Sequence, residues 1–233
     1  MKTIGLIGGM SWESSLAYYR IINETTKQRL GGWHSAKSIL YSVDFAEIEA
    51  LQHQHQWSAA AQVMVTAAQS LERAGADCVL LCTNTMHKLA PDIAANINIP
   101  FLHIVDATAA RVQAGKLQTV GLLGTRFTME QDFYRGRLTQ NHGLSVVIPE
   151  AGDRTLVHDI IYQELCLGIV NPDSRQRLTE VIMRLIAQGA EGIILGCTEL
   201  ELLVRSDDAT VPLFPTTQIH AEAAVTHALA ASP

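Results

Sequence analysis

The chain has 233 residues, 48% of them hydrophobic and 17% charged, which is typical of a globular protein with a substantial core and excludes a disordered one. The formal net charge is −6 and there is no basic run, which argues against nucleic acid and an anionic membrane surface as partners. No apolar stretch approaches membrane-spanning length and the opening residues do not form a secretory signal, so we expect a cytoplasmic protein with four free cysteines.

Short apolar runs without polar alternation recur along the chain and predict buried strands of parallel sheets. In chain order they span residues 3–8, 38–43, 78–81, 100–104, 119–124, 144–149, 192–196 and 211–215. Helical patterns lie between them and end at or near glycines: residues 57–74 before Gly75, residues 128–141 near Gly143, and a helix capped by Asn171 and Pro172 at Gly189. Alternating strands and helices predict an α/β fold.

Two phrases of the first half recur in the second. "IGLIGGMS" at Ile4 matches "VGLLGTRFT" at Val120, and "GADCVLLCTNT" at Gly75 matches "GAEGIILGCTE" at Gly189, with almost the same separation. The repeat predicts two α/β lobes, residues 1–104 and 105–210, facing each other across a cleft, with residues 211–233 able to pack back onto the first lobe. In such sheets ligands bind beyond the carboxyl ends of the strands.

The cysteines do not coincide in the repeat. Cys82 lies opposite Gly196, and Cys197 lies opposite Thr83. Because adjacent strand residues point to opposite sides, Cys82 and Thr83 should not both point into the cleft, and the repeat favours Thr83. One extra turn residue would reverse that choice, so Cys82 stays an alternative. Two further cysteines are expected in the core, Cys78 and Cys166.

Cys197 has the pattern of a reactive thiol. It follows a strand, lies between Gly196 and Thr198, and opens a short helical segment, residues 198–204. A helix N-terminus stabilises a thiolate, and a neighbouring glycine allows a ligand to approach closely. The alternative is a half-buried, inert thiol.

Cofactor and metal sites are not expected. "GLIGGMS" lacks the G-x-G-x-x-G spacing of dinucleotide-binding loops, and no clustered His, Cys and carboxylate residues have the spacing of a zinc site. Pyridoxal phosphate needs a lysine, and the only one near a strand end is Lys88, on a predicted helix face.

The phrases "GLIGGMSWES", "TNTMH", "LLGTRFTM", "IILGCTEL" and "PLFPTTQIHAEAAV" together resemble the cofactor-independent aspartate/glutamate racemases, over almost the whole chain. The resemblance implies a two-lobed α/β protein, usually a homodimer, that uses two cysteines on opposite faces of the substrate α-carbon. The second cysteine of the family matches Cys197. The first belongs to a Cys-Asn-Thr phrase, which here reads Thr83-Asn84-Thr85.

The resemblance therefore implies an unequal pair of catalytic residues. Cys197 would remove the α-proton of L-aspartate or L-glutamate, and Thr83, a poor base, would supply or relay a proton on the far face, with a kinetic bias toward the L-substrate. Substrate contacts are expected from eight residues: Met10, Ser11, Gln52, Asn84, Thr85, Thr125, Thr198 and Glu199. Arg126 and His87 are candidates for reading a distal carboxylate.

Two other functions stay open. The chain could be a decarboxylase or dicarboxylate isomerase of the same superfamily, since one cysteine suffices for protonating an enediolate. It could also be an amino-acid-binding protein without turnover.

Overall fold

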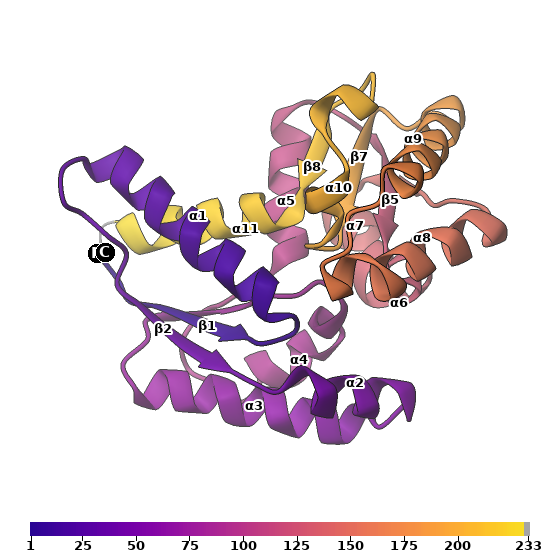
Figure 1. Ribbon diagram of the computed structural model, residues 1–233. Helices are drawn as coiled ribbons and strands as arrows, with labels where there is room; N and C mark the ends of the chain where they lie inside the picture. Colours follow the sequence, from indigo (N-terminus) through magenta and orange to yellow (C-terminus); the bar gives the residue numbers. More distant parts are fainter. Residues whose placement is uncertain (231–233) are drawn as a thin grey trace. The chain divides into compact units, whose positions relative to one another are not determined.

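The computed structural model describes residues 1–230, which form two compact units (Figure 1). The first unit comprises Met1–Ile104 together with the chain from His220, and the second comprises Val105–Ile219. The predicted return of residues 211–233 to the first lobe includes residues 231–233, which lie outside the described part. No helix of the described residues has both the length and the apolar character needed to cross a membrane.

The first unit is built on a four-stranded parallel sheet in the order β2-β1-β3-β4. Its strands are β1 (Ile4–Gly8), β2 (Ser38–Ser42), β3 (Cys78–Leu81) and β4 (Phe101–Leu102). Its helices are α1 (Trp12–Leu30), α2 (Phe45–His53), α3 (Trp57–Arg73), the 3-10 helix η1 (Thr85–Leu89), α4 (Ala90–Ala94) and most of α11 (Thr216–Leu229).

Two apolar clusters cover the two faces of this sheet. On one face, Ile4, Leu6 and Leu80 pack against α1 and α11. On the other face, Ile7 and Val79 pack against the apolar side of α3. Figure 1 shows α1 and α11 above the strands and α3 below them. Burial on both faces explains why these strands are continuously apolar.

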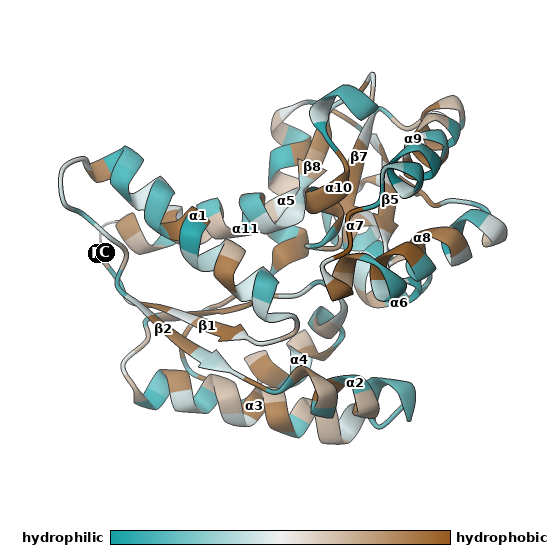
Figure 2. Ribbon diagram, viewed as in Figure 1, coloured by the Kyte–Doolittle hydropathy of each residue, from teal (hydrophilic) through white to brown (hydrophobic). Residues whose placement is uncertain are grey.

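The second unit repeats this plan, with the strand order β6-β5-β7-β8 and all pairs parallel. Its strands are β5 (Thr119–Gly124), β6 (Ser145–Val147), β7 (Gly192–Gly196) and β8 (Leu213–Pro215). Its helices are α5 (Ile104–Ala114), α6 (Arg126–Glu130), α7 (Asp132–His142), α8 (Ala151–Gln163), η2 (Leu165–Leu167), α9 (Pro172–Ala187), α10 (Leu200–Leu203) and η3 (Ser206–Asp208). Figure 2 shows hydrophobic colouring along β5 and β7, whose side chains pack on α8 and α9.

The matching strand orders confirm the predicted α/β class with two four-stranded parallel sheets. Two helix predictions are wrong in detail. The helix expected over residues 128–141 is two helices, because Gln131 adopts an extended conformation (φ −92°, ψ 149°) that ends α6 and precedes α7. The segment expected from Thr198 forms a helix only from Leu200, and it ends after one turn at Val204, which is extended (ψ 131°).

Glycines at the ends of β5 and β7 bring these strands together just before the candidate site residues. A Cβ at Gly196 would lie 2.8 Å from the carbonyl oxygen of Leu123, and one at Gly124 would lie 2.7 Å from the carbonyl oxygen of Gly196. Either contact is too short to tolerate without a backbone shift. Glycine at both positions therefore allows β5 and β7 to approach closely at the point where Thr125 and Cys197 follow them.

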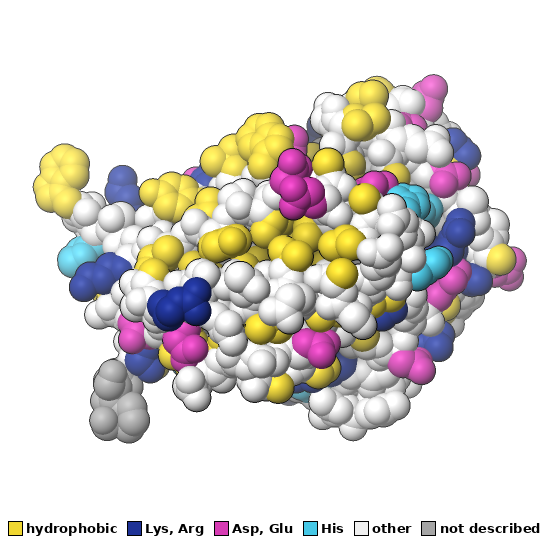
Figure 3. Space-filling view, turned by 90° about the horizontal axis from the view of Figure 1, so that it is seen from below, with side chains coloured by type: hydrophobic (Ala, Val, Ile, Leu, Met, Phe, Trp, Pro, Cys, Tyr) yellow, Lys and Arg dark blue, Asp and Glu magenta, His cyan; other side chains and the backbone are white. Residues whose placement is uncertain are grey.

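The surface charges follow the expectation from the sequence that basic residues are not clustered. On the face shown in Figure 3, the Lys and Arg side chains of the described residues are scattered among Asp and Glu and form no basic patch.

Candidate functional site

In the first unit, the candidate residues Thr83, Asn84 and Thr85 follow β3, and all three are buried. Cys82, directly before them, is 0% exposed and belongs to the apolar cluster on the side of α1 and α11. Its backbone N–H donates to the carbonyl oxygen of Ile7 at 2.9 Å, so it still has strand pairing. Burial raises the pKa of the Cys82 thiol far above its ordinary value. These surroundings are those of a core thiol and not of a proton carrier.

The turn after β3 is held by His87, which is 1% exposed. Its Nδ1 lies 2.7 Å from the carbonyl oxygen of Thr83, and its Nε2 accepts from the backbone N–H of Ile104 at 3.2 Å. Both ring nitrogens thus bond to backbone groups of the first unit. His87 therefore stabilises this turn, and its binding of a distal carboxylate stays a prediction that these two hydrogen bonds disfavour.

Three other candidates of the first unit lie after β1 and β2. Ser11 caps α1, with its Oγ accepting from the N–H of Ser14 at 3.4 Å, and Met10 directly precedes it. Gln52 lies on α2, and its side-chain amide donates to the Met86 sulfur at 2.9 Å. Met10, Ser11 and Gln52 are all buried. The sheet therefore gathers them at its carboxyl end, with the turn after β3.

In the second unit, Thr125 follows β5, and Cys197, Thr198 and Glu199 follow β7. Thr125 caps α6 by accepting from the N–H of Thr128 at 3.3 Å. Because β5 and β7 are paired neighbours up to Gly124 and Gly196, these residues leave the same end of the sheet.

A single carboxylate oxygen connects the residues after β7. Glu199 Oε2 accepts from the Cys197 thiol at 3.0 Å and from the Thr198 hydroxyl at 2.5 Å. Cys197 is 6% exposed, and Glu199 is also buried. The thiol therefore has a proton acceptor in direct contact.

These surroundings overturn one expectation about Cys197. Burial, followed by the charge of Glu199, raises the pKa of the Cys197 thiol well above its ordinary value. The expected helix N-terminus does not stabilise a thiolate, because α10 begins only at Leu200 and has a single turn. Burial and the Glu199 charge both favour the protonated form of Cys197, whose sulfur lies 3.0 Å from Glu199 Oε2.

A second carboxylate, Glu201, lies close enough to Glu199 for their charges to interact, and no sequence pattern pointed to it. Burial raises the pKa of Glu201 to about 7, and the charge of Glu199 adds to that shift. Glu201 Oε1 accepts from the backbone N–H of Thr217 at 3.1 Å, at the start of α11. The adjacent Thr216 donates its hydroxyl to the carbonyl oxygen of Leu195 in β7 at 2.8 Å. The signal for these threonines was their position directly after β8, where the other site residues follow their strands.

Arg126, the other candidate for a distal carboxylate, is exposed at the start of α6. One of its guanidinium nitrogens donates to the Thr155 hydroxyl at 3.4 Å, on α8. Among the residues that the structure describes, no group of three or more His, Cys, Asp or Glu side chains is arranged to hold a metal ion.

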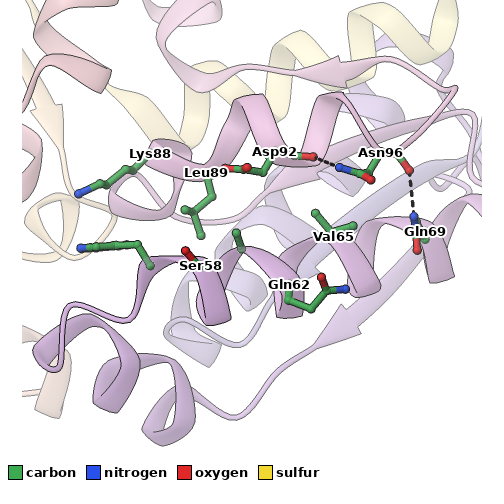
Figure 4. A pocket seen from close by; sticks show the side chains of 10 residues that line it. Ser58, Gln62, Val65, Gln69, Lys88, Leu89, Asp92 and Asn96 are labelled. Atoms are coloured by element: carbon green, nitrogen blue, oxygen red, sulfur yellow. Dashed lines mark hydrogen bonds between the residues drawn. The ribbon is translucent and has the colours of Figure 1, made fainter.

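A groove of about 460 Å³ in the first unit lies apart from the candidate residues (Figure 4). It runs between α3 and the η1–α4 segment, and the Lys88 ammonium lies 4.0 Å from the centre of the Trp57 ring. None of the predicted site residues is among its lining, which comprises Trp57, Ser58, Ala61, Gln62, Val65, Gln69, Lys88, Leu89, Asp92 and Asn96.

Comparisons with known proteins identify the family of this chain. The family model described as Asp/Glu/Hydantoin racemase matches residues 7–224. The broad specificity amino-acid racemase RacX of Bacillus subtilis is 24% identical over 172 residues, which is 72% of each chain.

Two solved structures are similar over nearly their whole length. A candidate Asp/Glu racemase from Yersinia pestis is 58% identical with a TM-score of 0.93, covering 98% of this chain and 100% of that one. An aspartate racemase homologue from Pyrococcus horikoshii is 34% identical with a TM-score of 0.86, covering 98% and 99%. The chain therefore belongs to the Asp/Glu/Hydantoin racemase family of isomerases.

Proposed function

We propose that this protein is a cofactor-independent racemase of L-aspartate and L-glutamate, in which Cys197 is the base and Thr83 serves the opposite face of the α-carbon. The observation that carries the proposal is the hydrogen bond from the Cys197 thiol to the Glu199 carboxylate. A buried thiol with a proton acceptor in contact can become a thiolate without a metal or an organic cofactor.

The proton transfers balance with these groups and solvent water. The thiol proton passes to Glu199, and the Cys197 thiolate then takes the substrate α-proton. The electron pair of the broken C–H bond is delocalised into the substrate α-carboxylate. The Thr83 hydroxyl gives a proton to the other face of the carbon, directly or through a water, and regains one from solvent, while Glu199 releases its proton.

Binding of the substrate makes the first step easier. The charge of Glu199 is one cause of the raised pKa of Cys197. A substrate ammonium group next to Glu199 would offset that charge and favour the thiolate. Donors on the α-carboxylate stabilise the carbanion, and Asn84, Thr85 and Thr198 are the residues that we assign to this role. Met10, Ser11, Gln52 and Thr125 are assigned to the walls of the site.

The two catalytic groups differ in strength. A thiol has an ordinary pKa of about 8.5, far below that of an aliphatic alcohol, so Thr83 is a weak base but an adequate donor to a carbanion. The proposal therefore includes faster turnover of L- than of D-substrate. The equilibrium between mirror images is unaffected, so the bias is kinetic.

Exchange of the α-proton in deuterated water, followed by proton NMR, tests the proposal. The protein should exchange the α-proton of L-aspartate or L-glutamate and accumulate the D-enantiomer. Cys197→Ser should lower both rates by about 10² to 10⁴-fold, the usual contribution of a positioned proton carrier. Cys78→Ser, a change at a buried thiol at the start of β3 in the first unit, is the matched control and should keep both rates. Full exchange by Cys197→Ser would contradict the proposal.

The same assay separates the two alternatives. Binding without exchange would favour an amino-acid-binding protein, and turnover of a malonate or a dicarboxylate would favour a decarboxylase or isomerase of the superfamily. The homodimer, the cytoplasmic location and the two-domain division at residues 104 and 105 stay predictions. Light scattering, cell fractionation and limited proteolysis would test them in that order.

A further inference from the structure

His87 lies in a buried group of three histidines in the first unit. Its ring centre is 4.7 Å from that of His103 and 5.6 Å from that of His220. All three side chains are buried. The group lies where β4 passes into α5 and where the chain returns from the second unit, at Ile219–His220.

The backbone partners of His87 define its protonation. A carbonyl oxygen only accepts hydrogen bonds and a backbone N–H only donates them. The contact with the Thr83 carbonyl therefore requires a proton on Nδ1, and the contact with the Ile104 N–H requires a lone pair on Nε2. With both bonds in place, the ring is neutral and has its proton on Nδ1.

Local geometry explains why a side chain is needed here. In an α-helical turn the N–H of His87 would bond to the Thr83 carbonyl, but in η1 it bonds to the Asn84 carbonyl at 3.1 Å. The His87 ring provides the donor that the Thr83 carbonyl would otherwise lack. The pairing of β3 with β4 also ends at Leu80 and Leu102. Beyond that point, His87 connects the two segments in place of a strand ladder.

His220 supports this connection from a second direction. Its Nε2 lies 2.8 Å from the Leu102 carbonyl oxygen, and its Nδ1 lies 2.8 Å from the Tyr18 hydroxyl. By the same reasoning, Nε2 donates to the carbonyl and Nδ1 accepts from Tyr18. The ring beside His87 is thus fixed by α1 and β4.

We propose that His87 is a positioning residue for Thr83. It does not exchange protons with the substrate; it fixes the Thr83 backbone, and with it the hydroxyl, by linking the Thr83 carbonyl to the Ile104 amide. This inference rests on the proposed function, because it assigns Thr83 the second proton transfer. Displacement of a reacting group by about 1 Å can lower a rate by about 10²-fold, so losing the link should matter for that transfer alone.

Two substitutions of His87 each keep one of its two hydrogen bonds to the backbone and remove the other. The side-chain amide of His87→Asn can reach the Nδ1 position and donate to Thr83, but it cannot reach Ile104. The longer His87→Gln can place its amide oxygen near the Nε2 position and accept from Ile104, but it leaves the Thr83 carbonyl without its donor. His142→Asn is the matched control, because it weakens a contact with Asp106 in the second unit (2.8 Å) and leaves Thr83 untouched.

His87→Gln should lower D-product formation by about 10² fold while changing the exchange of the L-substrate α-proton less than about 3-fold. His87→Asn should retain D-product formation within about 10-fold, and His142→Asn should keep the ratio of the two rates. Equal loss of both reactions in the two His87 variants, in step with a lowered melting temperature, would overturn the proposal.

A measurement independent of turnover checks the link itself. In the unmodified protein, ¹⁵N NMR of the His87 ring should show a protonated Nδ1 and an unprotonated Nε2. The opposite tautomer would overturn the link whatever the reaction. If the unmodified protein exchanges no α-proton of any acidic amino acid, the proposed function is wrong and the role of His87 in it falls too, while the tautomer still shows whether the link exists.

Discussion

The turns after β3 and β7 occupy the same place in the two repeated sheets, yet they carry different functional groups with different partners. After β3, an alcohol stands on a turn fixed by an imidazole bonded to two backbone groups. After β7, a thiol and a hydroxyl share one carboxylate oxygen, and a second, half-buried carboxylate follows two residues after Glu199. The two sheets have the same strand order, and the side chains make the end of β7 acidic and leave the end of β3 without a carboxylate.

The difference suggests different roles for the two turns in proton transfer. The thiol end has a partner able to take its proton, whereas the structure gives the alcohol end a backbone support. Under the proposed function, only the end after β7 can start the reaction efficiently. Substitutions at three places would break or sharpen this contrast: at Glu199, at the end of β3 and at Glu201.

The largest effect is expected from Glu199→Gln. Removing this carboxylate should lower exchange of the L-substrate by about 10² to 10³-fold, because no group in contact with Cys197 then takes the thiol proton or binds the substrate ammonium. Since the charge of Glu199 raises the pKa of Cys197, its removal should also lower that pKa. The rate of alkylation by iodoacetamide should therefore begin to rise at a lower pH than in the unmodified protein. A variant with full exchange would show that Glu199 only shapes the turn.

An intermediate effect is expected from making the two ends alike. Thr83→Cys should raise turnover of the D-substrate by about 10 to 100-fold, because a thiol is the stronger base. Thr83→Val, which has the same shape without the hydroxyl, should lower D-product formation. Enantiomer-resolved rates by chiral chromatography give both results. Cys82→Ala should leave both rates unchanged, and a dead Cys82→Ala variant would mean that Cys82 carries the second transfer.

The smallest effect concerns stability at the acidic end. The pKa of Glu201 is about 7 in the folded protein, against an ordinary value of 4.5. The folded state therefore binds the proton more tightly, so the contribution of Glu201 to stability is fully present below pH 4.5 and is lost as the pH rises to about 7. Glu201→Gln should remove this pH dependence. The free energy of unfolding of the variant, relative to that of the unmodified protein, should therefore be higher above pH 7 than at pH 5, by at most about 3 kcal/mol. Urea unfolding of both proteins at pH 5 and pH 8 measures this change. If the stability difference between the two proteins were the same at both pH values, the raised pKa of Glu201 would be contradicted.

Much of the fold was predictable from the sequence, since both sheets are buried on both faces and their strands are continuous apolar runs. The helix over residues 57–74 is confirmed as α3, and the strand over residues 3–8 as β1. The break at Gln131 was not predictable, because it depends on a backbone conformation that the helical pattern of residues 128–141 does not encode.

The site was predictable in its location and less so in its electrostatics. Strand ends and the internal repeat select Thr83 and Cys197 as candidates, and their catalytic roles stay a prediction. The pKa of Cys197 depends on which way Glu199 turns and on how short α10 is, and neither is visible in a residue pattern. The role of His87 was hidden for a similar reason, because both of its partners are backbone groups and one lies on a different element.

The chain completes its first unit with its last helix. Ala221, Ala224 and Val225 of α11 fill the core cluster against Ile4 and Leu6, and the N–H of Lys2 bonds to the carbonyl oxygen of Ala228 at 2.9 Å. During synthesis on the ribosome, the half made first must therefore wait with one face of its sheet covered by α1 alone, while Val105–Ile219 already has all of its strands. The later half is expected to reach its native state first, and the earlier half only after α11 has emerged from the ribosome.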